Sequence, residues 1–255
     1  MFEPRIANTT SFQWFGASVS PRSWSDSWLI AGMLTFLQQV GVDDGAGIEP
    51  SAWRMEAVRE LVLRYGEGTP LNPPVRAFDW NAYYKGSLVL HMLRVRLGET
   101  AFWQGMRAYY AAHRYATAST DDFEAAMTAA AAGTGVDVAA LFDSFVHRAG
   151  EPLIHAGWRP AGDGTVRVQF CQGGEPFDLA IVAAAHGGGR TARAGTRLAG
   201  AEGTLDIAAP FAVEGVTIDP DFTLPAEIRV VRLADGAATT CDAVAAAWAA
   251  GGTAP

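Results

Sequence analysis

The sequence is poor in cysteine and has no run of basic residues, and each shortage excludes a class of protein. Cys171 and Cys241 are the only two cysteines in 255 residues and stand far apart, so neither a disulfide framework nor a thiolate metal site is expected. This sparse use of cysteine indicates a reducing compartment. Lysine and arginine form no cluster and the formal net charge is -8, which opposes the basic surface that nucleic acids require.

Long apolar runs are also missing. A membrane-spanning helix needs roughly 18 continuous apolar residues, and no stretch of the chain approaches that length. Residues 1–8 contain Glu3, Pro4 and Arg5 and no apolar run of signal-peptide length. We therefore expect a soluble, cytoplasmic protein made without an export signal, which binds neither membranes nor nucleic acid.

Histidine is scarce as well, and its spacing does not suit metal binding. None of the five histidines has another histidine three or four residues away, the spacing that brings two imidazoles to one helix face. They are His91, His113, His147, His155 and His186. The sequence also lacks the G-x-S-x-G elbow that presents a serine nucleophile.

The first part of the chain has the pattern of a helical domain. From Pro21 to about Gly150 the apolar residues recur at helical spacing, interrupted by glycine, proline and cap residues. Ser119 with Asp122 has the form of a capping box, and Asp137 has the form of an N-cap. We expect helices over residues 58–65, 80–97, 102–110, 120–132 and 138–146.

Beyond Pro152 the apolar period changes from about 3.6 to 2, which is typical of strands. Strands are expected over residues 166–170, 177–181, 204–208, 213–218 and 228–233, and one short helix around residues 241–249. Short strands separated by glycine-rich turns indicate a small β-sandwich. We divide the chain into a helical domain (1–151), a β-sandwich domain (152–233) and an alanine-rich tail (234–255) whose end we expect to be disordered.

The segment from residue 6 to residue 36 carries the clearest motif. It resembles the zinc-site segment of the aminopeptidase N family of zinc metallopeptidases, HExxHQWFGxxV followed by WxDxWLNEGFA. The matching residues are Gln13, Trp14, Phe15, Gly16 and Val19, then Trp24, Asp26, Trp28, Leu29 and Gly32. The resemblance covers about residues 6–231. It implies an α+β multidomain fold, in which a helical gluzincin-type (thermolysin-like) catalytic subdomain precedes a small β-sandwich.

The residues that hold zinc in this family are replaced in the chain. The motif register places the first histidine at Asn8, the general-base glutamate at Thr9, the second histidine at Phe12 and the glutamate ligand at Ala31. Phenylalanine and alanine have no lone pairs for a metal, and asparagine and threonine are weak neutral donors. Zinc, the cofactor that the resemblance implies, is therefore not expected here, and neither is any other cofactor. Peptide hydrolysis by the family's route is excluded.

Two interpretations account for these replacements. Phe12 and Ala31 are residues that a chain places where a polar cavity has become packed core, and we favour this interpretation. In the alternative, Asn8, Thr9 and Tyr84 line a remodelled polar pocket for another ligand. Tyr84 belongs to a stretch, residues 83–94, that resembles the family's YxKGxxVLxMLR helix. The resemblance implies that Tyr84 occupies the position that stabilises the oxyanion, where it is not expected to act alone.

These observations favour a catalytically inactive aminopeptidase-like protein, or pseudopeptidase, that serves as an interaction or scaffold module. The sequence shows no counterpart of the family's N-terminal domain, with its GxMEN strand. We therefore expect an apolar surface that a protein partner covers, formed by Trp14, Phe15, Trp24 and Trp28. One alternative is half of a split or multi-chain assembly whose partner supplies that domain. Another, of lower weight, is a metal-independent enzyme around Tyr84.

Overall fold

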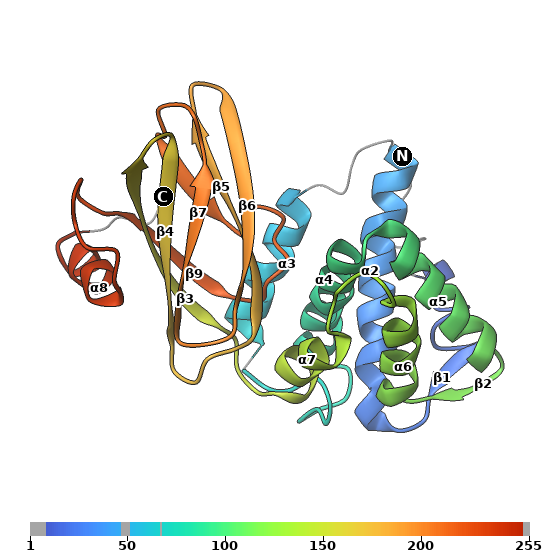
Figure 1. Cartoon of the computed structure of the whole chain (residues 1–255). Coiled ribbons are helices and arrows are strands. Elements are labelled where there is room, and N and C mark those ends of the chain that lie inside the picture. Colours follow the sequence, from blue (N-terminus) through green and yellow to red (C-terminus); the bar gives the residue numbers. More distant parts are fainter. Residues whose placement is uncertain (1–8, 47–51, 67, 252–255) are drawn as a thin grey trace. The chain divides into compact units, whose positions relative to one another are not determined.

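The computed structural model describes residues 9–46, 52–66 and 68–251, and the chain divides into two compact units (Figure 1). The first unit runs to Glu151 and also includes Phe222–Pro225. The second unit comprises Pro152–Asp221 and the residues from Ala226 onward. Helices dominate the first unit and strands the second, so the α+β class predicted from the sequence is confirmed.

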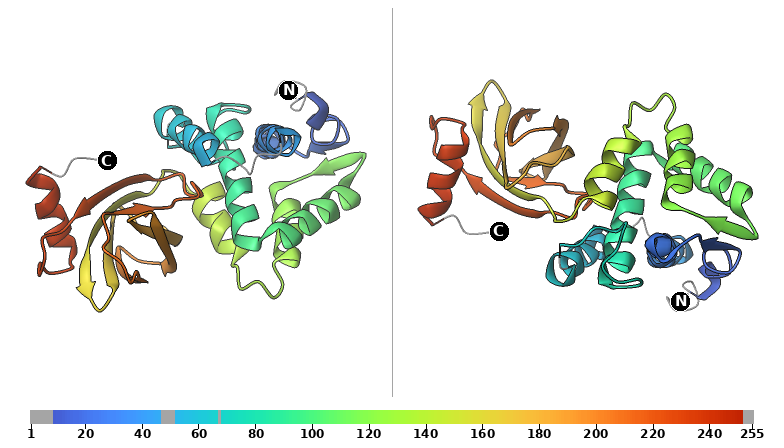
Figure 2. Two further views of the ribbon diagram at one scale, coloured as in Figure 1. Left: turned by 90° about the horizontal axis from the view of Figure 1, so that it is seen from above. Right: turned by 90° about the horizontal axis from the view of Figure 1, so that it is seen from below.

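The longest helix of the first unit, α2 (Ser27–Ala46), runs side by side with α4 (Gly86–Leu97) (Figures 1 and 2). The other elements of this unit are β1 (Val19–Pro21), η1 (Trp24–Asp26), α3 (Ala52–Tyr65), η2 (Asn81–Lys85), α5 (Glu99–His113), β2 (Ala116–Ala118), α6 (Thr120–Ala130), α7 (Val138–Phe142) and η3 (Asp143–His147). The expected helices are therefore present. The one expected from residue 80 begins as a π-helical turn, η2, and the last one divides into α7 and a second π-helical turn, η3.

The helix starts predicted from cap residues are confirmed. The Ser119 hydroxyl accepts from the Asp122 amide at 3.3 Å, while the Asp122 carboxylate accepts from the Ser119 amide at 2.8 Å. The Asp137 carboxylate accepts from the Ala140 amide at 3.0 Å. These bonds satisfy amides that the first helical turn leaves without a partner.

Two glycines of the recognised motifs let α2 and α4 approach closely. A Cβ added to Gly32 would lie 2.8 Å from the carbonyl carbon of Gly86, and one added to Gly86 would lie 3.1 Å from the Cα of Gly32. Each helix therefore presents bare backbone to the other at this crossing. These two glycines, which match the resembling motifs, thus have a packing role.

The second unit contains two sheets. Their strand orders are β7-β4-β3-β9 and β6-β5-β8, and every pair is antiparallel except β3 with β9. The strands are β3 (Leu153–Gly162), β4 (Thr165–Gly173), β5 (Leu179–Gly187), β6 (Arg190–Leu198), β7 (Glu202–Ala208), β8 (Gly215–Ile218) and β9 (Glu227–Arg232). The predicted strands over 166–170, 204–208 and 228–233 correspond to β4, β7 and β9. Those expected from residues 177 and 213 begin two residues later, as β5 and β8.

Two strands were missed because their sequences lack a run of alternating apolar residues. β6 reads RTARAGTRL and keeps most of its residues exposed, and β3 contains Gly157 and Pro160. Edge position and tertiary pairing rather than local pattern make β6 a strand, since it pairs along its length with β5. The helix expected around residues 241–249 is present as α8 (Cys241–Ala249).

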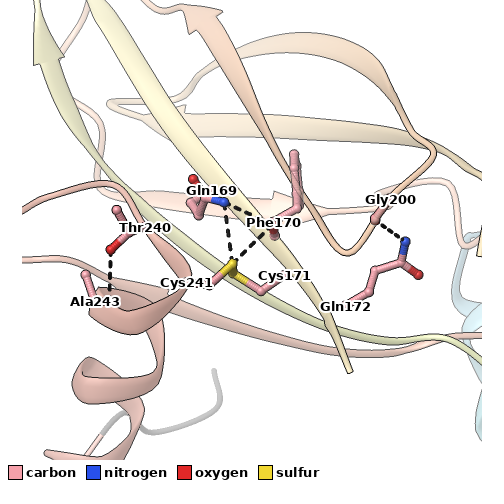
Figure 3. Close-up of a disulfide and its surroundings, with 8 residues drawn as sticks. All are labelled: Gln169, Phe170, Cys171, Gln172, Gly200, Thr240, Cys241 and Ala243. Atoms are coloured by element: carbon pink, nitrogen blue, oxygen red, sulfur yellow. Dashed lines mark hydrogen bonds between the residues drawn. A yellow bond between two sulfur atoms is a disulfide. The ribbon is translucent and has the colours of Figure 1, made fainter. Parts of the chain in front are cut away.

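The expectation that the two cysteines are unconnected is wrong. Cys171 near the end of β4 and Cys241 at the start of α8 form a disulfide, although 70 residues separate them in sequence (Figure 3). Sequence distance is no measure of spatial distance once a sheet and a following helix pack together. The alanine-rich segment after Leu233 accordingly belongs to the second unit through α8, and residues 252–255 lie outside the described part of the chain.

Among the residues that the structure describes, none of the helices is long and apolar enough to cross a membrane.

Replacing Gly32 with alanine tests the helix crossing. Gly32→Ala should lower the free energy of unfolding by about 2 kcal/mol, because overlap with the Gly86 backbone outweighs the gain of about 1 kcal/mol in helix propensity. Gly105→Ala is the control, because a Cβ there would meet side chains of Met127 and Ala130 at 3.0 Å. The Met127 side chain can move away, and the gain in helix propensity offsets the tight contact with Ala130, so this variant should stay within about 1 kcal/mol of the wild type. Urea denaturation followed by circular dichroism measures both, and equal losses would contradict the proposed crossing.

Candidate functional site

Of the positions that hold zinc in the resembling family, the three that the structure describes do not converge on a polar cavity. Asn8 lies outside the described residues, and Thr9 is exposed in a helical turn over residues 9–11. Phe12 is 47% exposed, whereas Ala31 is fully buried in α2. The prediction of packed core at these positions therefore agrees with Ala31 and is wrong for Phe12.

Phe12 remains at the surface because of the turn that follows it. A Cβ added to Gly16 would lie 2.4 Å from Cε2 of Phe12, so the aromatic ring lies against this glycine. Gly16 has a φ of 131°, a conformation that residues with a side chain rarely adopt. The ring therefore covers the backbone of the turn rather than entering the core.

The residues present do not fit a zinc ion. Structural and catalytic zinc sites take three or four ligands from histidine, cysteine and carboxylates. Of the described residues at the matched positions, Thr9 offers a neutral hydroxyl, and Phe12 and Ala31 offer no donor. No group of three histidine, cysteine, aspartate or glutamate residues in the described ranges is arranged to hold a metal ion.

The tyrosine at the motif's oxyanion position is Tyr83, one residue before the predicted Tyr84. The motif YxKG has its tyrosine two residues before the lysine, and Lys85-Gly86 sets the register, so the matching residue is Tyr83 rather than Tyr84. The Tyr83 ring lies 6.5 Å from that of Phe78, and Phe78 meets Trp24 edge to face at 6.0 Å. Tyr83 thus belongs to a partly exposed aromatic row, Trp24–Phe78–Tyr83.

Tyr84 has a packing role instead. Its ring stacks on Trp80 at 5.2 Å, and Trp80 stacks on Tyr65 at 5.3 Å. Tyr84 also packs against a buried apolar cluster made of Met55, Val58, Val62 and Leu88. Aromatic stacks of this spacing stabilise a fold by themselves, so the position of Tyr84 has an explanation that requires no ligand.

A pocket opens beside this stack, lined by Tyr65, Gly66, Val75, Arg76, Asp79, Trp80 and Asn81. Two of its polar side chains already serve local structure. The Asp79 carboxylate accepts from the Ala82 amide at 2.9 Å, and the Asn81 amide donates to the Gly66 carbonyl at 2.6 Å. The described lining contains no serine, threonine, cysteine, lysine or histidine, the side chains that most often act as nucleophile or general base.

The aspartate of the second motif block organises a buried hydrogen-bond network. Oδ1 of Asp26 accepts from the amide and the hydroxyl of Thr120 at 2.8 and 2.9 Å, and Oδ2 accepts from the amide and hydroxyl of Ser23 at 3.1 and 2.9 Å. Nε1 of Trp28 donates to the Thr120 hydroxyl at 3.0 Å, and Nδ2 of Asn72 donates to it at 2.6 Å. The motif residues Asp26 and Trp28 therefore join α2 to α6.

Of the four aromatic residues predicted to form an interface, two are buried and two are exposed. Trp28 is fully buried, with its ring edge to face with those of Phe123 and Phe142. Phe15 is nearly fully buried, and its ring stacks on that of Tyr109 at 6.5 Å. Trp24 and Trp14 are exposed, by 70% and 46%. Only these two of the four residues are available to a partner.

Lys85, the only lysine in the sequence, is fully buried. Its Nζ donates to the carbonyls of Thr69 and Gly150 at 3.4 and 3.3 Å and lies 3.5 Å from the Glu151 carboxylate. Burial lowers the pKa of Lys85, while the charge and the hydrogen bond of Glu151 oppose that shift. The motif lysine thus ties η2 to the segment at which the chain leaves the first unit.

Comparison with known proteins agrees with the motifs. Residues 5–145, more than half of the chain, match the Peptidase family M1 domain. The chain therefore belongs to peptidase family M1, and the resemblance to aminopeptidase N is confirmed.

The matching curated relatives are much longer proteins. The thyrotropin-releasing hormone-degrading ectoenzyme of Homo sapiens is 29% identical over 163 residues, which are 58% of this chain and 15% of that protein. Aminopeptidase N of Lactococcus lactis subsp. lactis is 28% identical over 171 residues, 59% of this chain and 19% of that protein. The chain spans less than a fifth of the length of either.

A solved structure shares the fold. Aminopeptidase A of Legionella pneumophila, determined in complex with aspartic acid, superposes with a TM-score of 0.72 at 14% sequence identity. The match covers 89% of this chain and 26% of that one. The similarity therefore extends beyond the residues that the family profile matches.

The pH dependence of stability tests the buried lysine. The pKa of Lys85 lies below 10.5 in the folded chain and returns to that ordinary value on unfolding. Between the two values the unfolded chain binds the extra proton, so the free energy of unfolding should rise with pH, by at most about 1.4 kcal/mol per pH unit.

Urea denaturation between pH 7 and 10 measures the free energy of unfolding of the wild type and of Lys85→Met, which lacks the titrating group. The difference between the two pH slopes is the contribution of Lys85. Lys85→Arg is the control, because a guanidinium stays charged throughout this range and should give the same slope as Lys85→Met. A wild type whose stability relative to Lys85→Met falls as pH rises would contradict the sign.

Proposed function

We propose that this chain is a non-catalytic member of the M1 family, a pseudopeptidase that serves as a protein-interaction or scaffold module. In this proposal, the first unit is a gluzincin-type helical subdomain without its chemistry, and the two sheets of the second unit form a β-sandwich. The observation that carries the proposal is the joint replacement of both histidines, the general base and the glutamate ligand, by Asn8, Thr9, Phe12 and Ala31.

The chemical argument follows from what these residues cannot do. A zinc ion lowers the pKa of its bound water to about 7 and polarises the scissile carbonyl, and a glutamate accepts the proton of that water. Thr9, Phe12 and Ala31 offer neither a ligand set nor a general base. A tyrosine at 83 or 84 can donate to a developing oxyanion, but only where a nucleophile creates one.

The motif residues that remain support the same proposal. Asp26 and Trp28 belong to the buried network, Gly32 and Gly86 form the helix crossing, and Lys85 ties η2 to Gly150. Each of these residues is required for packing or for satisfying buried polar groups. A chain that keeps the packing residues and loses the catalytic ones retains the fold of an enzyme without its activity.

Metal analysis and an aminopeptidase assay on the purified protein test the proposal. We expect much less than one zinc per chain after dialysis against zinc, and no cleavage of aminoacyl substrates above a heat-treated control. Stoichiometric zinc with chelator-sensitive cleavage would overturn it. Cleavage that resists chelator and is lost in Tyr84→Phe but not in Tyr83→Phe would instead support a metal-independent enzyme around Tyr84.

The second candidate function is the binding of a protein partner, and the exposed tryptophans favour it. A multi-chain aminopeptidase-like assembly is one form of this candidate. Trp24 is 70% exposed and contacts Phe78, which is itself 38% exposed. Exposed tryptophans are frequent anchors of protein interfaces, where they fill pockets on the partner. Trp14, 46% exposed, offers a second anchor in the same unit.

Affinity purification from the source cells, followed by light scattering, tests this candidate. We expect a stoichiometric partner with the wild-type chain and at least a tenfold loss of that partner with Trp24→Ala or Trp14→Ala. Val95→Ala is the control, since Val95 is an exposed apolar residue (44%) near the end of α4, and it should keep the partner. A monomeric wild-type chain that purifies alone would contradict the candidate.

A further inference from the structure

The disulfide joins the start of α8 to the four-stranded sheet. Cys241 is the first residue of α8, Cys171 pairs with His155 across the β3–β4 ladder, and the two cysteine Cα atoms lie 5.7 Å apart. Figure 3 shows the bond at the point where the helix begins beside β4. The Thr240 hydroxyl caps the same helix by accepting from the Ala243 amide at 3.3 Å.

The non-covalent contacts of α8 with the sheet are few. Val244 is the buried side chain of this helix, and it fits into space that Gly157 leaves open, where an added Cβ would lie 2.5 Å from Val244 Cγ2. The remaining alanines of α8 are exposed or half-buried. Trp248 is half-buried, with its ring beside that of His155, so the apolar burial of α8 comes mainly from Val244 and part of one indole ring.

Two buried nitrogens oppose the docking of α8. Nε1 of Trp248 and Nε2 of His155 are buried and have no hydrogen-bond partner among the residues that the structure describes, although their rings lie 6.4 Å apart. Burying a polar atom without a partner costs free energy of the same order as burying one aliphatic side chain contributes. These two atoms partly offset what the burial of Val244 and of the Trp248 ring supplies, and the disulfide adds a covalent bond that fixes the start of the helix on the sheet.

We infer that the Cys171–Cys241 disulfide holds α8 on the sheet, and that the protein works in an oxidising compartment. In forming the bond, the two thiols lose two protons and two electrons to a thiol oxidant such as a protein disulfide, which is reduced to a dithiol. Reducing compartments keep protein thiols reduced, so a protein that depends on this bond has to act elsewhere. This inference replaces the reducing, cytoplasmic location expected from the number of cysteines, and it is independent of the proposed function.

Hydrogen exchange of the full chain tests the role of the bond. In Cys171→Ser/Cys241→Ser, amides of residues 241–249 should lose protection at least tenfold, because an undocked helix of this length is unstable. Residues 179–187 of β5 should stay protected. Val244→Ala with the disulfide intact is the matched control and should keep α8 protected. Protection of α8 that persists without the bond, or is lost in Val244→Ala, would overturn the inference.

The wild type treated with dithiothreitol gives the same comparison without substitutions, should the double variant fold poorly. The compartment is tested separately. The protein is extracted from its own cells into a thiol-alkylating buffer, denatured, and analysed by intact-mass spectrometry to count the alkylated cysteines. We expect no alkylated cysteine. Two alkylated cysteines would show that the bond is not formed in the cell and would overturn the inference.

Discussion

The buried carboxylate of Asp26 is the constraint on which the first unit depends. It accepts hydrogen bonds from Ser23 before α2 and from Thr120 at the start of α6, and Trp28 and Asn72 complete the network through the Thr120 hydroxyl. Removing the carboxylate would leave several buried donors without an acceptor, which is costly in a protein interior. The network therefore sets the position of α6 against α2, and with it the packing of Trp28, Phe123 and Phe142.

This constraint gives the motif residues a structural role that is separate from catalysis. The residues shared with the aminopeptidases carry buried hydrogen bonds, a helix crossing and a buried ammonium, and none of these functions requires zinc. The substituted positions differ in their surroundings, because Ala31 is enclosed by the core while Phe12 covers Gly16, a glycine with a positive φ, at the surface. Membership of peptidase family M1 therefore describes ancestry and fold, and the site residues bear on activity separately.

Local interactions were the most predictable part of this structure. The capping box of Ser119 and Asp122, the cap at Asp137 and the helix over Cys241–Ala249 depend on residues within a few positions of each other, and all three are confirmed. Strand β6 and the π-helical turn η2 escaped prediction, because pairing with β5 and packing against α2 decide them. The capping box of Ser23 and Asp26 had the same local signature and could have been found.

The sequence by itself determined the family, the helical and strand-rich halves, and which residue types stand at the positions of the zinc motif, because each follows from residue identity at a fixed spacing. Only the tertiary structure decided that Trp28 is buried while Trp24 is exposed, that Phe12 lies at the surface, and that Cys171 meets Cys241. Burial and bonding between distant residues depend on which segments pack together. That packing depends on the whole chain and cannot be predicted from a local pattern of side chains.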